Sequence, residues 1–145
     1  MDKTIEYYKV IEALLIAKGF DFLVEKREAL YGFIVTNYGN LGANEKVYLG
    51  VSGRVVSIHA YVTENNLENA EKRIQVVDKL NELNQISSFT KFVLDNNNRV
   101  YLESTFLLFG DIKDVANHVS EMFLIFNQEL DERTSEILQL INNKE

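Results

Sequence analysis

The sequence predicts an α+β fold of order α-β-β-β-β-α-β-β-α, in which helices pack on an antiparallel sheet. Long segments with apolar residues at helical spacing occur near the start, the middle and the end of the chain. Segments with an apolar residue at every second position lie between them. Most neighbouring segments of this second kind are joined by short turns, which favours antiparallel pairing over parallel crossovers.

Length, composition and charge limit the number of domains, the kinds of chemistry and the classes of partner. The chain has 145 residues, 46% of them apolar, which suits a single domain over residues 1–145 with one core. It contains no Cys, so disulfides, thiol catalysis and Cys-ligated metal sites are excluded. The net charge of −7 argues against binding to nucleic acid and to anionic membranes, because both need a surface rich in Lys and Arg.

The first helix is predicted over residues 2–18, and Gly19 suits the left-handed residue that follows a helix. Its apolar positions recur at helical spacing: Ile5, Tyr8, Ile11, Leu14 and Leu15. A strand is predicted next, over residues 20–26, with Phe20, Phe22 and Val24 on one face.

Three further strands are predicted over residues 30–38, 46–51 and 54–62. The first of them is apolar on both faces around Ile34, which indicates an inner position in the sheet. Residues 39–44 have the composition of a turn, and Ser52-Gly53 suits a tight hairpin. In the last of the three, the predicted core face is Val56, Ile58, Ala60 and Val62, which leaves His59 on the other face.

A second helix is predicted over residues 66–85, with Asn65 or Asn66 as its N-cap. Its apolar stripe is Leu67, Ala70, Ile74, Val77, Leu80 and Leu83. A hairpin follows over residues 91–103, turning at Asp95-Asn96-Asn97-Asn98, where Asn tolerates a positive φ. The predicted core face of the hairpin is Phe92, Leu94, Val100 and Leu102, and Phe106 shares this face.

The last helix is predicted from the N-cap Asp111 to about residue 142, with a candidate break at 131–133. Its main apolar stripe is Ile112, Val115, Ala116, Val119, Phe123, Phe126 and Leu130. Because Leu124 and Ile125 fall outside this stripe, the helix is apolar nearly all round near its middle. Met122, Leu124 and Ile125 therefore need a second cover, which either of the other helices, a second copy of the chain or a client peptide could supply.

The sequence gives no sign of catalytic chemistry. His59 and His118 have no second His or Cys at the spacing of metal ligands. Asp111 and Asp114 fall in the first turn of a helix, where carboxylates stabilise the helix dipole. Neither a Ser nucleophile elbow nor a phosphate-binding glycine loop is present. We therefore predict no enzyme activity, no catalytic residue, no metal and no cofactor.

One segment of about 25 residues resembles the YbjN family of small bacterial proteins. The matching pattern is a helix ending in Leu80-Asn81 and Leu83-Asn84, then Lys91-Phe92-Val93-Leu94-Asp95 and Arg99-Val100-Tyr101-Leu102. The family is described as sensory-transduction regulators, and its fold is similar to that of the chaperones of type III secretion. The resemblance implies a secretion chaperone-like fold, no catalytic residues to carry over, and dimers that hold an extended client.

Two functional hypotheses follow. The first is a non-enzymatic adaptor or chaperone-like module, a homodimer that binds an unidentified protein partner through Met122, Leu124 and Ile125. The second is a small-molecule-binding sensory domain, with a pocket on the curved sheet lined by aromatic residues: Tyr31, Phe33, Tyr48 or Tyr61, with His59 as the polar contact. The charged first turn and the lack of an apolar run of ~18 residues predict a cytoplasmic protein by elimination.

Overall fold

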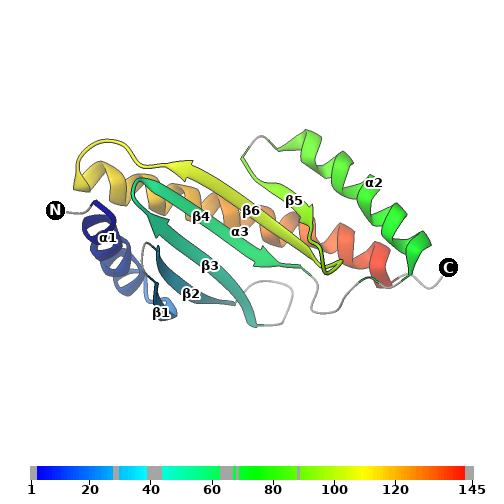
Figure 1. The fold of residues 1–145 in the computed structure, drawn as a ribbon, viewed down its shortest axis with the longest axis horizontal. Helices are drawn as coiled ribbons and strands as arrows, with labels where there is room; N and C mark the ends of the chain where they lie inside the picture. Colours follow the sequence, from blue (N-terminus) through cyan, green and yellow to red (C-terminus); the bar gives the residue numbers. More distant parts are fainter. Residues whose placement is uncertain are drawn as a thin grey trace.

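The computed structural model describes residues 3–27, 30–38, 44–62, 67, 69–87 and 89–142. Three helices and six strands lie in these ranges, in the predicted order (Figure 1). The helices are α1 (Lys3–Ala17), α2 (Ala70–Ile86) and α3 (Ile112–Asn142). The strands are β1 (Asp21–Arg27), β2 (Leu30–Tyr38), β3 (Asn44–Ser52), β4 (Val55–Tyr61), β5 (Lys91–Leu94) and β6 (Val100–Leu107).

The strands form one antiparallel sheet of order β1-β2-β3-β4-β6-β5. The first four strands form a meander, and the β5–β6 hairpin joins it with β6 beside β4. Helix α2 and its flanking segments lie between β4 and β5 in the chain, so β5 ends at the outer edge. The predicted α+β fold with an antiparallel sheet is confirmed.

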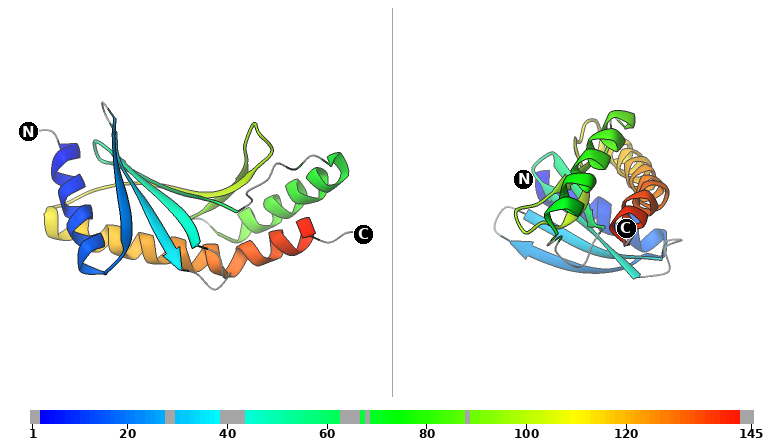
Figure 2. Two further views of the ribbon diagram at one scale, coloured as in Figure 1. Left: turned by 90° about the horizontal axis from the view of Figure 1, so that it is seen from below. Right: turned by 90° about the vertical axis from the view of Figure 1, so that its right-hand side faces the viewer.

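All the helices lie on one side of the sheet or beyond its end. Helix α3 runs behind the sheet, with α1 against one of its ends and α2 against the other (Figures 1 and 2). Figure 2 also shows that the sheet curves so that its other side is concave. Within the part of the chain that the structure describes, no helix covers this concave side, which we call the uncovered face.

The core fills the space between the sheet and α1 and α3. Along β4, Val56, Ile58 and Ala60 are buried, as their alternation predicts. The ring of Phe33 from β2 stacks on Tyr8 from α1 at a centroid distance of 5.2 Å. A second ring contact joins Phe20, which precedes β1, to Phe123 of α3, edge-on at a centroid distance of 5.4 Å. These ring contacts join the sheet to both α1 and α3.

The predicted helix ends and turns are mostly confirmed. Gly19 has a φ of +74° after α1, and Asn98 has a φ of +58° in the hairpin turn. Asp111 caps α3, because its Oδ1 accepts from the backbone N–H of Asp114 at 3.0 Å. The predicted turn at residues 39–44 falls mostly on residues 39–43, which lie outside the described residues.

Helix α2 differs from the prediction at its start and in its buried stripe. Its N-cap is Asn69, whose side chain accepts from the backbone N–H groups of Glu71 and Lys72, so the predicted caps Asn65 and Asn66 are wrong. The buried residues are Val76, Leu80 and Leu83, whereas Ile74 is 63% exposed and Val77 is also exposed. The reason is that, among the described elements, α2 packs mainly against β5 and α3 at the end of the molecule, so it buries a narrow stripe.

Helix α3 is continuous over 31 residues, so the predicted break at 131–133 is wrong. Buried Thr134 and Ile137 extend the predicted stripe toward the end of the helix. Five positions of the predicted stripe itself are buried: Val115, Val119, Phe123, Phe126 and Leu130. Ile112 is exposed and Ala116 is half-buried, because the helix begins beyond the packed part of the sheet. None of the described helices combines the length and apolar content needed to cross a membrane.

At the β5 edge of the sheet, a side chain of α2 occupies the outward backbone groups of one strand residue. The backbone N–H of Phe92 donates to Asn84 Oδ1 at 2.7 Å, and Asn84 Nδ2 donates to the carbonyl of Phe92 at 3.0 Å. The Asn84 amide therefore takes the place that a neighbouring strand would occupy. The opposite edge, β1, keeps exposed side chains such as Leu23, Glu25 and Lys26 and has a strand neighbour on one side only.

Candidate functional site

The uncovered face carries one row of side chains that crosses all six strands. The registers of the strand pairs place in this row Leu23, Ile34, Tyr48, His59, Glu103 and Lys91, in the spatial order of the strands. A second pair, Tyr61 and Tyr101, lies beside it across β4 and β6. The row changes from aliphatic to aromatic to charged across the sheet, and cross-strand pairs of this kind stabilise the sheet.

Four rings at the centre of this face form a contiguous group, which we call the aromatic cluster: Tyr48, His59, Tyr61 and Tyr101. The imidazole of His59 stacks on Tyr48, with centroids 4.9 Å apart and ring planes 9° apart. Tyr61 and Tyr101 each lie 6.3 Å from His59, at 87° and 71° to its plane. Because these rings are inclined, they present their faces in different directions.

Hollows lie on either side of His59. One, of ≈ 360 Å³, is lined by Glu25, Leu30, Tyr48 and the paired glycines Gly32 and Gly50, together with His59. The two glycines leave this space open, since a Cβ on Gly50 would lie 3.2 Å from Leu30 Cδ1. The other hollow, of ≈ 440 Å³, is lined by Tyr61, Asp95, Tyr101, Glu103 and Thr105, again with His59.

The protonation states of this site follow from burial and hydrogen bonding. Burial disfavours the imidazolium and lowers the pKa of His59, so the ring is neutral at neutral pH. Burial, and then the nearby Glu103 carboxylate, raises the pKa of Tyr101, which stays a phenol. The backbone N–H of Arg99 donates to Asp95 and lowers the pKa of that carboxyl, which is therefore charged.

The structure brings together only part of the predicted pocket. His59, Tyr48 and Tyr61 meet on the uncovered face. Tyr31 and Phe33 point to the opposite side, where Tyr31 packs against Tyr8 at 4.9 Å and Phe33 is 1% exposed. The assignment of Tyr31 to the pocket is wrong, because Gly32 and Ile34 are the β2 residues on the side of Tyr48, and Tyr31 points the other way. Phe33 is among the residues that line the first hollow, although its side chain is buried on the helix side of the sheet.

Tyr101 and Glu103 were missed as site residues, although a signal for them exists in the sequence. The alternation of the β6 segment places them on the face opposite the core residue Leu102. What the sequence does not give is the pairing of β6 with β4. That pairing sets Glu103 opposite His59 and Tyr101 opposite Tyr61.

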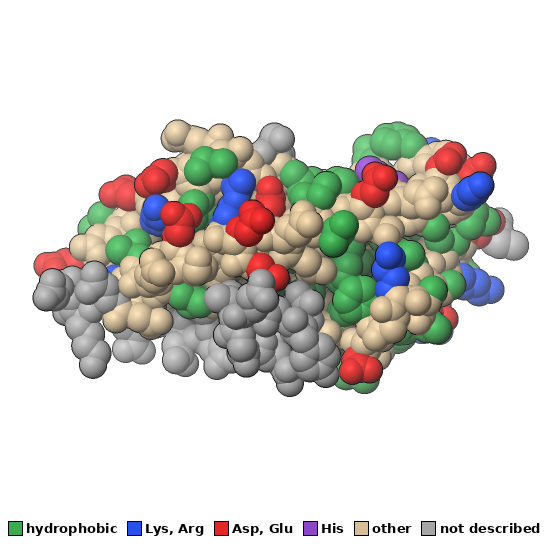
Figure 3. Space-filling view, turned by 180° about the vertical axis from the view of Figure 1, so that it is seen from behind, with side chains coloured by type: hydrophobic (Ala, Val, Ile, Leu, Met, Phe, Trp, Pro, Cys, Tyr) green, Lys and Arg blue, Asp and Glu red, His purple; other side chains and the backbone are tan. Residues whose placement is uncertain are grey.

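The predicted partner-binding residues lie on a different surface, the side of α3 that faces away from the sheet. Leu124 is 59% exposed and Ile125 is 39% exposed, whereas Met122 is half-buried. Figure 3 shows this side of the molecule, where hydrophobic side chains are exposed among charged ones. Within the described residues, neither α1 nor α2 covers Leu124 and Ile125, so the alternative in which another helix of the chain covers them is wrong.

The two histidines do not share a site. His118 of α3 meets Phe106 of β6 edge-on at 5.2 Å, on the helix side of the sheet, whereas His59 lies on the uncovered face. Among the described residues, His, Asp and Glu side chains nowhere gather in a group of three or more that could hold a metal ion.

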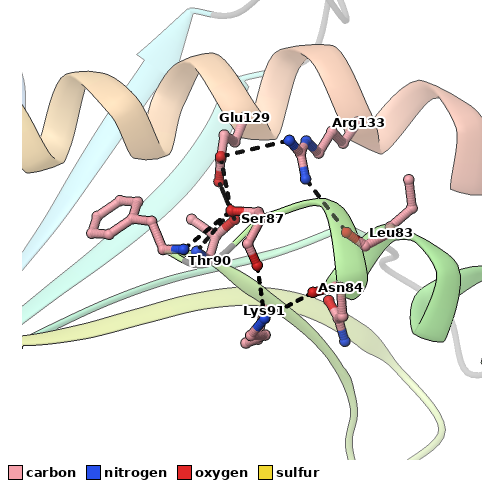
Figure 4. Close-up of polar contacts among 8 residues, drawn as sticks. Leu83, Asn84, Ser87, Thr90, Lys91, Glu129 and Arg133 are labelled. Carbon is pink, nitrogen blue, oxygen red and sulfur yellow. Dashed lines mark hydrogen bonds and ion pairs between the residues drawn. The ribbon is translucent and has the colours of Figure 1, made fainter.

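A polar cluster joins α3 to the end of α2 and the start of β5 (Figure 4). Glu129 accepts hydrogen bonds from the hydroxyls of Ser87, at 2.9 Å, and Thr90. Arg133 lies 3.8 Å from Glu129 and also donates to the carbonyl of Leu83 at 3.4 Å. The hydroxyl of Ser87 accepts from the backbone N–H of Thr90, so this serine is engaged in structure rather than poised as a nucleophile.

The same region satisfies the free carbonyls at the end of α2. Lys91 Nζ donates to the carbonyls of Asn84 and Ser87 at 2.8 and 2.7 Å (Figure 4). Together with Arg133, it places two cations at the negative end of the helix dipole. This arrangement fixes α2 and β5 on α3, and it draws the Lys91 amino group toward the end of α2.

The comparisons with known proteins bear on the fold alone. Neither a scan against models of protein families nor a search of curated proteins finds a match. A crystal structure of an uncharacterized protein from Methanothermobacter thermautotrophicus is similar, with a TM-score of 0.50 and 14% sequence identity. The similarity covers 85% of this chain and 98% of that protein. The YbjN-like resemblance remains a prediction.

Proposed function

We propose that the chain is a non-enzymatic protein-interaction module of the cytoplasm, an adaptor or chaperone-like protein that binds a segment of a protein partner. The observation that carries this proposal is the uncovered face. It is concave, it carries the aromatic cluster, and it is hollowed on both sides of His59. Tyrosine-rich patches of this kind are typical of protein-binding surfaces, because Tyr provides a large contact area and a polar tip.

Site-specific crosslinking tests this function. A photoreactive residue at the exposed position Thr105, which lines the second hollow, should crosslink to a discrete polypeptide in the native cell extract. The matched control is Gln75, an exposed polar position on α2, where no such product should form. A product of equal yield at both positions, or none at Thr105, would refute the proposal.

The second candidate function is a small-molecule-binding sensory domain on the same face. The observation that favours it is the volume of the hollows, ≈ 360 and ≈ 440 Å³, which lies in the range of ligand pockets. Native mass spectrometry of protein purified from its own organism distinguishes the two functions. A bound compound that is lost in a Tyr48→Ala variant would favour the sensory domain.

We also propose that the chain forms a homodimer through α3. Leu124 and Ile125 are exposed apolar side chains, and each contributes up to about 1.5–3 kcal/mol when fully buried, before association costs. The Ile125→Glu variant should therefore sediment as a monomer where the wild-type chain sediments as a dimer. A matched Gln75→Glu variant should remain dimeric. A monomeric wild-type chain would rule out this assembly.

A further inference from the structure

We propose that the partner segment is basic and extended, and that one of its Lys or Arg side chains binds in the hollow beside Tyr61, Tyr101 and Glu103. This inference rests on the proposed function and names the chemistry of the partner. Three observations support it. The hollows of the uncovered face are lined by carboxylates, and Glu103 forms no ion pair with a described Lys or Arg. Tyrosines of this protein also form cation–π contacts with Lys and Arg side chains of the same chain.

The described residues that line the hollows include three carboxylates, and their one basic side chain is the neutral imidazole of His59. Glu25 lines the first hollow, and Asp95 and Glu103 line the second. No Lys or Arg is among the described residues that line either of them. An acidic segment would bring like charges together on this face, whereas a basic segment would meet opposite ones.

Of the two carboxylates that line the second hollow, Glu103 is the one available to a partner. Asp95 is engaged by Arg99, whose Nε lies 3.7 Å from Asp95 Oδ2. The strand neighbour of Glu103 on β5 is Lys91, but the amino group of Lys91 donates to the carbonyls of Asn84 and Ser87 instead. The neighbour on β4 is His59, which is neutral. Glu103 therefore faces the second hollow with no ion pair to a described Lys or Arg.

The tyrosines of this protein already hold cations over their rings. The guanidinium carbon of Arg99 lies 4.5 Å from the centroid of Tyr61. On the other side of the sheet, Lys26 Nζ lies 5.5 Å from the Tyr8 centroid and 5.8 Å from that of Tyr31. Tyr101 lines the same hollow as Glu103, at 58° to Tyr61. A cation in this hollow would meet a ring face and a carboxylate together.

The arrangement of the hollows favours a peptide over a free amine. The hollows adjoin on either side of His59 and share it as a wall. In an extended chain, successive side chains on one face are about 6–7 Å apart. One segment can therefore place side chains in both hollows, one against the aliphatic wall of Leu30 and the next against Glu103.

The test measures the binding of fluorescently labelled peptides to the full chain by anisotropy. The basic peptide alternates Lys or Arg with apolar residues, and its two controls carry Glu or Gln in place of the cations. We expect the basic peptide to bind and the Glu peptide not to bind. Glu103→Lys should weaken binding by about tenfold or more, and Glu103→Gln by less. Circular dichroism verifies that each variant is folded.

The control for overall charge is Glu132→Lys, which makes the same change at an exposed position of α3 and should leave binding unchanged. Equal binding of the Glu peptide, or an equal loss in Glu132→Lys, would overturn the inference. Binding of free butylamine as tight as that of the peptide would overturn the assignment to a protein segment. Because crosslinking from Thr105 does not depend on the charge of the partner, a crosslinked partner without a basic preference would sink this inference and leave the proposed function standing.

Discussion

Replacing Phe33 with alanine is expected to lower the free energy of unfolding by about 3–5 kcal/mol. Phe33 is 1% exposed and packs between two other rings, stacked on Tyr8 at 5.2 Å and edge-on to Phe22 at 5.7 Å. Truncation removes the buried ring and leaves a cavity between α1 and the sheet, which the rigid strand pairing of β2 on both sides prevents from closing.

Urea denaturation followed by circular dichroism measures this loss. The matched control is Leu23→Ala on the adjacent strand, where the side chain is 70% exposed on the other side of the sheet. That change should cost less than about 0.5 kcal/mol. Similar losses in the two variants would contradict the assignment of the sheet faces, and with it the uncovered face.

Glu129→Ala is expected to destabilise the protein by about 1.5–3 kcal/mol, the usual loss when a hydrogen-bonded charge is removed. The variant leaves the hydroxyls of Ser87 and Thr90 without their acceptor. It also leaves Arg133, whose side chain is 19% exposed, without the carboxylate that it faces at 3.8 Å. Because these groups join α2 and β5 to α3, hydrogen exchange should accelerate first in α2 and β5.

The variant Glu132→Ala provides the comparison, since it removes an exposed carboxylate from the same helix. A double-mutant cycle with Ser87→Ala then isolates the part of the loss that belongs to the contact with Ser87. Additive losses in this cycle, or a loss in Glu132→Ala as large as that in Glu129→Ala, would show that the polar cluster does not hold the two elements together.

Local periodicity is sufficient to predict the order of elements and the core side of most strands. The alternation around Ile58 and Leu102 places both in the core, as observed. It fails for α2, because Ile74 and Val77 fit the predicted stripe as well as Leu80 does. What decides between them is that, among the described elements, β5 and α3 are the main neighbours of α2. Which elements lie beside a helix is set by the tertiary structure and cannot be predicted from the periodicity of that helix alone.

Local periodicity also predicts part of the candidate site, but not the contacts that depend on strand pairing. The side of β4 that carries His59 follows from alternation alone. Its stacking on Tyr48 and its position opposite Glu103 depend on two strand registers, one of which joins segments more than 40 residues apart. Contacts such as that of Ser87 with Glu129, at a separation of 42 residues, also leave no local pattern in the sequence.

The amide of Asn84 on Phe92 has a consequence for how copies of this chain can associate through their sheets. An open-ended assembly through sheet edges needs two unpaired edges on every molecule, because each copy must pair with one neighbour at each edge. Here the outward backbone groups of Phe92 are already occupied by the Asn84 amide, so an incoming strand cannot pair with β5 at this residue, whereas β1 has a strand neighbour on one side only. Pairing of two copies through their β1 edges is therefore favoured over edge-to-edge pairing that uses β5.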